Sequence, residues 1–202
     1  MTFNSFPKIF IICPLNHNQR WNNMVKEMSK FGITNYERIE GMISPSNNYK
    51  DKEKAAHLAH IEAIEKAKER NYDKVLILED DCYFSDNILN YEIDNFLENN
   101  KWEIFYLGCH HTHPPLFVTK NVNQVVYAYC LHAYIVNQCL YDKLISFKSL
   151  NHDKEYDVWI PDTIQINQKC FALHPRAAFQ KQGYSYIQDN IIDYDKYLKD
   201  VI

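Results

Sequence analysis

Glycine is scarce in this chain. Its 202 residues include only four glycines, Gly32, Gly41, Gly108 and Gly183. They are too few and too widely spaced to form the glycine-rich phosphate loop of P-loop proteins or the GxGxxG turn of dinucleotide-binding proteins. Any nucleotide that binds this protein must therefore be held by other groups.

Three further absences narrow the possible functions. No CxxC pair occurs among the six cysteines, so we expect reduced thiols in the core. The net charge of -4 argues against a general nucleic-acid-binding surface. No apolar run approaches the roughly 20 residues of a membrane span, and residues 1–10 lack the features of a signal peptide. We expect a cytoplasmic protein without nucleic-acid partners, and the oligomeric state stays open.

The chain does contain a regular alternation of strand and helix patterns. Hydrophobic residues make up 46% of it, and its length predicts a single domain over residues 1–202. Alternating buried strands and amphipathic helices are typical of an α/β fold. The predicted strands cover residues 8–13, 36–42, 75–78, 102–109, 125–136 and 169–173. The predicted helices cover residues 19–31, 52–70, 87–99 and 138–147, with a short one at 191–202.

The most informative segment is a strand pattern that ends in three acids. Residues 75–78 are wholly apolar, and Glu79, Asp80 and Asp81 follow at once. Because an unpaired buried charge is costly, these acids should emerge at the carboxyl edge of the sheet, where α/β folds bind ligands. In an extended chain Glu79 and Asp81 point the same way, and two hard oxygen ligands favour Mg²⁺ or Mn²⁺. The alternative is a solvated acidic turn.

Three other segments carry reactive groups. His57 and His60 lie three residues apart in a predicted helix, where they face one ligand or form part of an ordinary polar face. Residues 109–113, Cys-His-His-Thr-His, predict either a substrate-binding loop or a solvated turn. In residues 155–162, Trp159 packs on a sugar ring or, more commonly, in the core. Asp157 or Asp162 is a candidate general base, or both cap the following helix.

Together these motifs resemble glycosyltransferase family 25, which includes lipooligosaccharide and collagen hydroxylysine galactosyltransferases. The resemblance spans about residues 9–187. The similar segments are 55–60 (the family's Gly-Cys-x-x-Ser-His), 76–84 (Leu-Glu-Asp-Asp-x-x-Phe), 105–108, 132–136 (His-Ala-Tyr-Ile-Ile), 157–159 and 174–180 (Pro-x-x-x-x-Gln), with Arg20 after the first strand. The departures are Cys13 for asparagine, Ala55 and Ala59 for glycine and serine, and Cys130-Leu131 for Gly-Thr.

This resemblance implies a GT-A-type (Rossmann-like) mixed sheet flanked by helices. It also implies a nucleotide-sugar donor, most often a UDP-hexose, and a Mn²⁺ or Mg²⁺ ion that neutralises the diphosphate in place of the missing glycine loop. Asp81 would be the main metal ligand, with Glu79 or Asp80 at the ribose or a second coordination position. The donor is also expected to contact Arg20, His60, His132 and Gln180. His132 or His174 would complete the metal shell. The expected base on the acceptor side is Asp157, with Asp162 as the second candidate.

The leading hypothesis is a metal-dependent, inverting glycosyltransferase that moves galactose, glucose or an N-acetylated form to a glycan or glycoprotein hydroxyl. Such reactions serve lipopolysaccharide biosynthesis and protein glycosylation. One alternative is a degenerate, noncatalytic protein that binds a sugar nucleotide or glycan, and another is a metal-dependent phosphohydrolase that uses the same acids. The donor, acceptor and linkage depend on a few pocket contacts that the sequence does not position.

Overall fold

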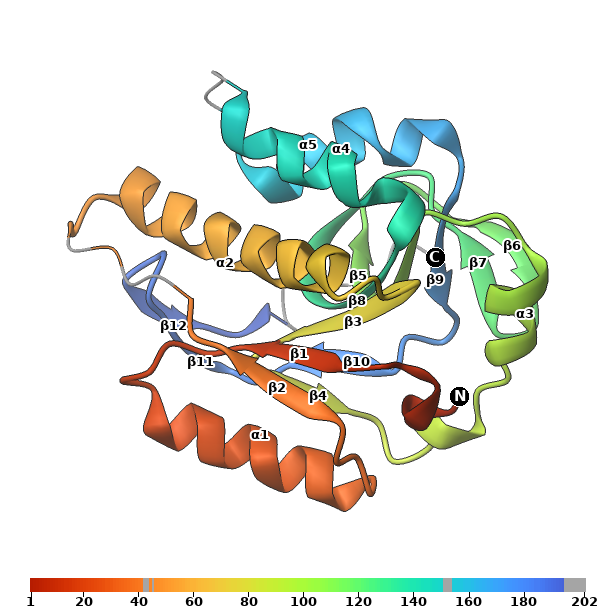
Figure 1. Ribbon diagram of the computed structural model, residues 1–202, viewed down its shortest axis with the longest axis horizontal. Coiled ribbons are helices and arrows are strands. Elements are labelled where there is room, and N and C mark those ends of the chain that lie inside the picture. The colour runs from red at the N-terminus through yellow and green to blue at the C-terminus, as the bar shows by residue number, and fades with distance from the viewer. Residues whose placement is uncertain (42–43, 45, 151–153, 195–202) are drawn as a thin grey trace.

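The protein folds around one large mixed β-sheet (Figure 1). The computed structural model describes residues 1–41, 44, 46–150 and 154–194. Within these residues the sheet has eight strands, which in spatial order are β2 (Tyr36–Ile39), β1 (Ile9–Ile12), β3 (Lys74–Glu79), β8 (Ala128–Asn137), β5 (Ile104–His111), β9 (Cys170–Leu173), β7 (Val122–Gln124) and β6 (Leu116–Thr119). The β1 strand runs parallel to β2 and β3, whereas β8 runs antiparallel to both of its neighbours.

Helices cover both faces of this sheet, as Figure 1 shows. The described α-helices are α1 (Asn18–Lys30), α2 (Tyr49–Glu69), α3 (Asp94–Asn99), α4 (Tyr141–Ser146) and α5 (Tyr156–Thr163). The short 3-10 helices are η1 (Phe3–Ser5), η2 (Ile88–Asn90), η3 (Gln138–Leu140), η4 (Phe147–Ser149) and η5 (Gln165–Asn167). One hydrophobic core lies under α2, α4 and α5, and the other lies under α1 and α3. No helix in the described part of the chain is both long and apolar enough to cross a membrane.

The central β3 strand has the burial that its apolar sequence predicts. Its four middle residues, 75–78, are fully buried between β1 and β8 and between the two cores. The strand ends at Glu79, and Asp80 and Asp81 form a tight turn into β4 (Cys82–Phe84), which pairs with β10 (Ala178–Gln180). The extended conformation therefore does not persist through Asp81, because the chain turns at Asp80 and Asp81.

The α2 helix begins and runs as its sequence indicates. The side chain of Asn48 accepts a hydrogen bond from the Lys50 amide at 3.0 Å and so caps the first turn. Lys66 and Lys68 in the last turn complement the helix dipole. Along the buried side of α2, the small side chains of alanines let the helix lie close to the sheet. These are Ala55, Ala59, Ala63 and Ala67.

Several observed elements differ from the predicted ones. The predicted helix over residues 87–99 is broken into η2 and α3, and the strand over 125–136 begins later, as β8. Residues 109–111 continue β5 and do not form a loop. Ile191 lies in strand β12 (Asn190–Ile192), so the predicted helix over residues 191–202 does not begin there. The rest of that helix from residue 195 on, and Met42 at the end of the predicted strand over 36–42, lie outside the described residues. Trp159 packs in the core. The sequence missed the short strands because three or four residues carry too little pattern, and the β4–β10 pair in addition joins distant segments.

Gly108 allows the closest approach between the large sheet and β10. A Cβ atom at this position would lie 2.0 Å from the carbonyl oxygen of Ala178 and 2.7 Å from Nε2 of His132. The Ala178 oxygen belongs to the backbone, so it cannot turn aside as a flexible side chain would. Glycine is therefore required here by space.

We expect Gly108→Ala to lower the free energy of unfolding by about 3 kcal/mol, because β10 must shift to accept the methyl group. Chemical denaturation followed by circular dichroism measures this loss. Gly32→Ala is the matched control, since it has a positive φ of +64° but no atom within 4 Å of the added Cβ. It should cost about 1 kcal/mol, from backbone conformation alone. Equal losses in the two variants would contradict the steric explanation.

Candidate functional site

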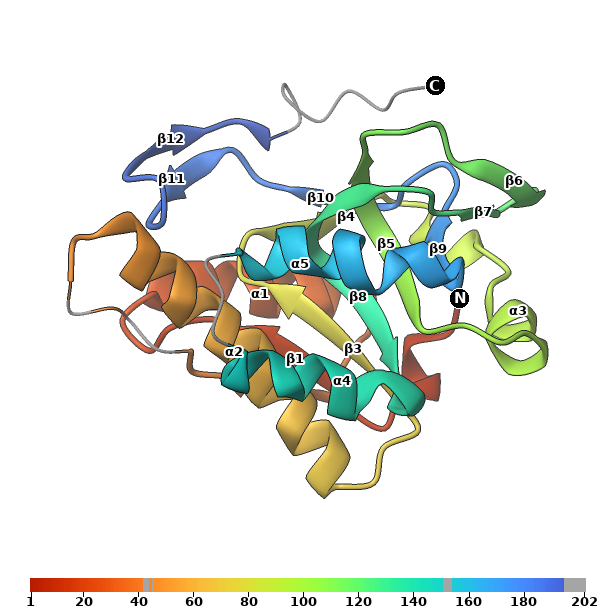
Figure 2. The same cartoon turned by 90° about the horizontal axis from the view of Figure 1, so that it is seen from above.

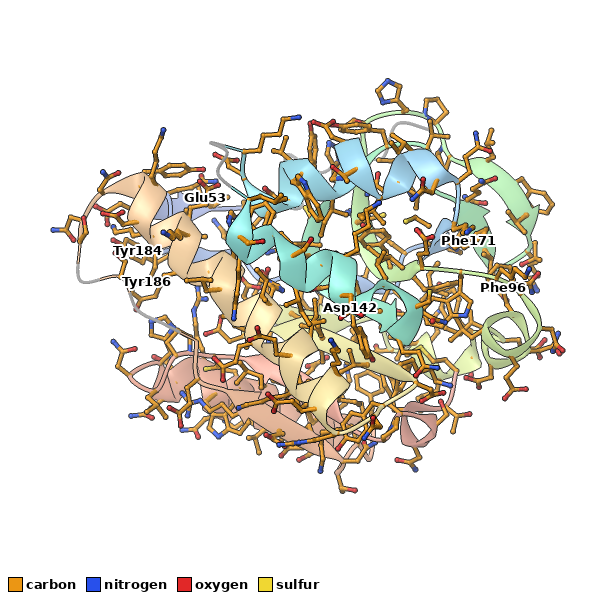
Figure 3. The ribbon with its side chains drawn as sticks, turned by 45° about the horizontal axis from the view of Figure 1, so that its top comes forward. Glu53, Phe96, Asp142, Phe171, Tyr184 and Tyr186 are labelled. Carbon is orange, nitrogen blue, oxygen red and sulfur yellow. The ribbon has the colours of Figure 1, made fainter. Side chains whose placement is uncertain are left out.

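A pocket of about 370 Å³ lies at the carboxyl ends of β1 and β3. Its walls come from the segment after β1, from α1, from α2, from the turn after β3, and from a small hairpin of β11 (Gly183–Ser185) and β12. Figures 1 and 2 both place this hairpin beside the N-terminal half of α2. In Figure 3, Tyr184 and Tyr186 project from the hairpin segment on that side of the molecule. The pocket therefore occupies the edge at which α/β sheets bind ligands.

The pocket gathers most of the residues predicted to bind the donor or a metal. They are Arg20, His60, Glu79, Asp80, Asp81 and Gln180. They come from α1, α2, the end of β3 and β10, elements that are far apart in the sequence. Parallel β1 and β3 bring the first three of these elements together, because their carboxyl ends meet at one edge.

Glu79 and Asp81 are two carboxylates with insufficient positive charge around them. Burial, followed by the charges of Asp80 and Asp157, raises the pKa of Glu79 to about 7. Burial, followed by the charge of Glu79, raises the pKa of Asp81 to about 7 as well. Oδ1 of Asp81 is buried and has no hydrogen-bond partner among the described residues. These two carboxylates fit a divalent cation. The cation would take the place of the carboxyl protons and would coordinate the unpaired Oδ1 of Asp81.

Asp80 differs from Glu79 and Asp81 in its hydrogen-bond partners and in the direction of its pKa shift. Its Oδ1 accepts a hydrogen bond from Nη1 of Arg20 at 2.7 Å, and its Oδ2 accepts one from Nδ1 of His17 at 3.2 Å. Burial acts to raise the pKa of Asp80, but the His17 hydrogen bond and the Arg20 charge outweigh it, so the pKa lies below its usual value. Asp80 is thus ionised and already paired by the protein itself.

The same two partners of Asp80 hold the hairpin over the pocket. Nη2 of Arg20 donates to the carbonyl oxygen of Tyr184 at 2.7 Å. The ring of Tyr186 stacks on His17 with 4.2 Å between centroids, and the Arg20 guanidinium lies 5.7 Å from the Tyr186 ring centre. Asp80 therefore orients both side chains on which the hairpin rests.

His60 links the pocket to the core. Burial lowers its pKa to about 4, so the ring is neutral at pH 7 and carries one N–H group. Nδ1 lies 3.0 Å from the hydroxyl of Tyr134, and Nε2 lies 3.3 Å from Oε1 of Glu79. With the tyrosine hydroxyl donating to Nδ1, the single N–H is on Nε2 and faces Glu79. His60 consequently fixes the direction of this carboxylate.

Cationic side chains line the pocket together with the acids. Lys52 on α2 and Lys181 after β10 join Arg20 in its lining. The backbone N–H of Lys181 donates to the carbonyl oxygen of Asp81 at 2.8 Å, which fastens this segment to the acidic turn. Cations and carboxylates in one pocket can hold a phosphate-bearing ligand together with a metal ion.

Besides Asp157, three predicted site residues do not line the pocket. His132 is buried and its Nε2 donates to the carbonyl oxygen of Ala178 at 3.2 Å. His174 is exposed after β9. Asp162 accepts hydrogen bonds from the Tyr127 hydroxyl and from Nζ of Lys154, both at 2.7 Å, and these bonds lower its pKa. The structure therefore separates these three side chains from the acids of the turn.

Asp157 lies in the first turn of α5, outside the pocket lining, but its charge influences the pocket. It acts to raise the pKa values of both His60 and Glu79. Burial raises the pKa of Asp157 itself, and its Oδ1 is buried without a hydrogen-bond partner among the described residues. Its nearest reactive neighbours are Glu53 and His57 on α2, which form with it a group of possible metal ligands.

The sequence analysis did not identify several residues of the pocket. His17 follows the first predicted strand, so the argument that placed the acids at the carboxyl edge would also have located it. No comparable signal in the sequence marks Lys52 or Lys181 as pocket residues. The same holds for Tyr184 and Tyr186, because their segment is exposed and has no regular hydrophobic pattern. Residues 109–113, predicted as a substrate-binding loop, do not contribute to the pocket lining.

The buried state of His132 makes stability depend on pH. Burial lowers its pKa from 6.5 to about 4, so between these pH values the unfolded chain binds the extra proton and the folded protein does not. The stabilisation is present above pH 6.5 and is lost as the pH falls toward 4. By pH 5 the loss amounts to about 2 kcal/mol.

Wild type should therefore lose about 2 kcal/mol more unfolding free energy than His132→Gln between pH 7 and pH 5. Urea denaturation at a series of pH values measures the difference. Replacement of the exposed His113 by glutamine is the control and should leave the wild-type profile unchanged. Parallel profiles for wild type and His132→Gln would contradict this assignment.

Comparisons with known proteins bear on the fold. No protein-family model matches the chain, and neither does any curated protein sequence. A crystal structure of a glycosyltransferase involved in the glycosylation of the major capsid of PBCV-1 is similar, with a TM-score of 0.57 at 12% identity over 95% of this chain and 97% of that one. A197 from STIV has a TM-score of 0.51 at 13% identity over 92% of each chain. The chain therefore has a GT-A-type α/β fold.

Proposed function

We propose that residues 1–202 form one catalytic domain of a glycosyltransferase similar to family 25. It moves a hexose from a nucleotide sugar, a UDP-hexose, to a hydroxyl of a glycan or glycoprotein. The observation that carries this proposal is the pair of Glu79 and Asp81, which shares a pocket at the carboxyl edge of a GT-A-type sheet with three cationic side chains. A diphosphate leaving group must be stabilised by positive charge. A divalent cation bound by the acidic pair would add to the charge of the three cationic side chains.

Asp81 and Glu79 are the residues that would hold the cation, Mn²⁺ or Mg²⁺. The unpaired Oδ1 of Asp81 supports this choice, since a buried oxygen without a partner is costly unless a ligand satisfies it. When bound, the ion neutralises the negative charge that develops on the departing diphosphate. Arg20 is held by Asp80, and Lys52 and Lys181 lie nearby, so these cations can bind the phosphate oxygens that the metal leaves uncovered.

Other residues of the chain orient the acids and limit solvent. His60 directs Nε2–H at Glu79, and Nε2 of Gln180 donates to Oε2 of the same carboxylate at 3.3 Å. The hairpin that rests on Arg20 and His17 forms one wall of the pocket and narrows its opening to solvent. Limiting water favours transfer to an acceptor over hydrolysis of the donor.

Asp157 is our proposed general base, with Asp162 as the second candidate. In an inverting transfer the acceptor oxygen bonds to the anomeric carbon while the bond from that carbon to the diphosphate breaks, and the hydroxyl proton passes to the base. A half-buried carboxyl of raised pKa suits this role. Asp162 is already occupied by Lys154 and Tyr127, which leaves it less available.

One observation favours the second candidate function, a noncatalytic protein that binds a sugar nucleotide. Cys130 stands where family 25 has glycine, and its φ of +83° is a conformation that suits glycine. Its thiol lies close enough to the pocket for the charges of Glu79 and Asp157 to raise its pKa, after burial, to about 12. A protein of this second kind would bind the donor without turnover.

Calorimetric titration of UDP-, GDP- and CMP-sugars, with Mn²⁺ and then with EDTA, tests the donor and metal assignments. We expect one UDP-hexose to bind only with Mn²⁺, and Asp81→Asn to weaken that binding at least tenfold because a cation ligand is lost. Asp86→Asn removes an exposed acid five residues away that pairs with Lys30, and it should bind like wild type. Unchanged affinity in Asp81→Asn, or no binding of any sugar nucleotide, would overturn the proposal.

We expect Asp157→Asn to keep donor binding but to lower the transfer rate by 10²-fold or more, on the order of a general base's contribution. Release of UDP in the presence of an acceptor glycan measures the rate, and calorimetry measures binding. Asp162→Asn should retain most activity. If Asp162→Asn alone lost transfer, Asp162 would be the base, and donor binding without turnover in wild type would favour the noncatalytic function.

A further inference from the structure

We propose that Glu53, His57 and Asp157 form a binding site for a divalent transition-metal ion of the Zn²⁺ type, separate from the donor pocket. One ligand atom from each side chain lies within 4.8 Å of the other two. None of the three residues contributes to the pocket lining. Asp157 is also the proposed general base, so the site shares one residue with the proposed transferase reaction, but Zn²⁺ binding is measured without that reaction.

The fold itself brings these ligands together. Glu53 and His57 are four residues apart on α2, so they lie one above the other on the same side of the helix. Asp157 comes from the first turn of α5, across the contact between the two helices. Figure 3 shows Glu53 on the part of α2 that lies nearest to the labelled hairpin tyrosines. The site thus joins two helices about 100 residues apart in the sequence.

The cluster is enclosed and rich in negative charge. The side chains of Glu53 and His57 are only 12% and 13% exposed, and Oδ1 of Asp157 is buried without a hydrogen-bond partner among the described residues. Glu155 adds a further carboxylate, to which the hydroxyl of Tyr49 donates at 3.4 Å. Three carboxylates gathered around one imidazole repel one another, and a divalent ion relieves that repulsion.

His57 supplies the nitrogen that distinguishes this site from the acidic pair of the pocket. Burial, followed by the charge of His60, lowers the pKa of His57 to about 3, so its ring is neutral, as a metal ligand must be. The backbone N–H of Tyr156 approaches the ring at 3.4 and 3.3 Å from its two nitrogens, so neither nitrogen has a short hydrogen bond for an ion to displace.

The donor set and its spacing select the ion. One imidazole and two carboxylates, with a fourth position for water, are typical ligands of Zn²⁺. Zn²⁺ bonds of about 2.0–2.2 Å place tetrahedral ligand atoms roughly 3.4 Å apart. Nε2 of His57 and Oε1 of Glu53 are 4.0 Å apart, so small side-chain rotations would complete the site. Mg²⁺ prefers an all-oxygen set and is therefore excluded.

Such an ion would hold the first turns of α2 and α5 together. Both turns lie close to the pocket, since Asp157 acts electrostatically on His60 and Glu79.

Zn²⁺ titrated by calorimetry into the metal-free full-length protein, with no nucleotide sugar present, tests the inference. We expect one tight site in wild type and at least tenfold weaker binding in His57→Ala and in Glu53→Gln, because each removes a ligand. X-ray absorption of the Zn²⁺-loaded protein should show a single imidazole ligand, absent in His57→Ala. Glu53→Gln keeps the shape of the side chain, so it remains informative if His57→Ala fails to fold.

Two controls separate this site from other sources of binding. Replacement of the exposed His113 by alanine should leave Zn²⁺ affinity unchanged, and so should Asp81→Asn, which alters only the pocket. Absence of a tight site in wild type, or wild-type affinity in both His57→Ala and Glu53→Gln, would overturn the inference. Loss of binding in Asp81→Asn with retention in His57→Ala would assign the ion to the donor pocket instead. Because His57→Ala leaves Asp157 in place, its effect is distinguishable from loss of the proposed base.

Discussion

The crowding of three successive carboxylates at the end of β3, with Asp80 buried and Glu79 and Asp81 partly buried, is the constraint on which the rest of the site depends. The strand is enclosed by β1, β8 and both hydrophobic cores, so its last residue reaches the sheet edge with little solvent around it. The protein itself neutralises Asp80, through Arg20 and His17. It leaves Glu79 and Asp81 with raised pKa values, and such uncompensated charge is characteristic of a site that binds a ligand.

The pairing of Asp80 has consequences beyond charge. The Asp80 carboxylate fixes Arg20 and His17, and the β11–β12 hairpin segment rests on these two side chains. Arg20 donates a hydrogen bond to a backbone carbonyl oxygen of this segment, and His17 stacks on one of its tyrosine rings. A change at the acidic turn is thereby transmitted to the cover of the pocket. Gly108 has a comparable role below the pocket, since its missing side chain lets β10 bring Gln180 next to Glu79.

The acidic groups around His60 fall into two clusters with different chemistry. On the pocket side, carboxylates and cations line the same cavity, as suits a phosphate-bearing ligand and a hard metal ion. On the side of α5, carboxylates surround the imidazole of His57, as suits a softer ion. His60 lies between them and responds to the charge of Asp157 while it faces Glu79. The two clusters thus provide distinct electrostatic environments on the two sides of His60.

The sequence by itself determined the α/β alternation, the burial of residues 75–78, the length of α2 and the emergence of the acids at a carboxyl edge, because these follow from local patterns and the cost of burying charge. It could not place the hairpin over Arg20 and His17, the β4–β10 pair or Glu53 beside Asp157, since each depends on contacts between distant segments. Only the tertiary structure decided which acids are paired. Asp80 and Asp81 are adjacent in sequence and alike in chemistry, and their opposite pKa shifts arise from partners that folding brings to one of them and not to the other.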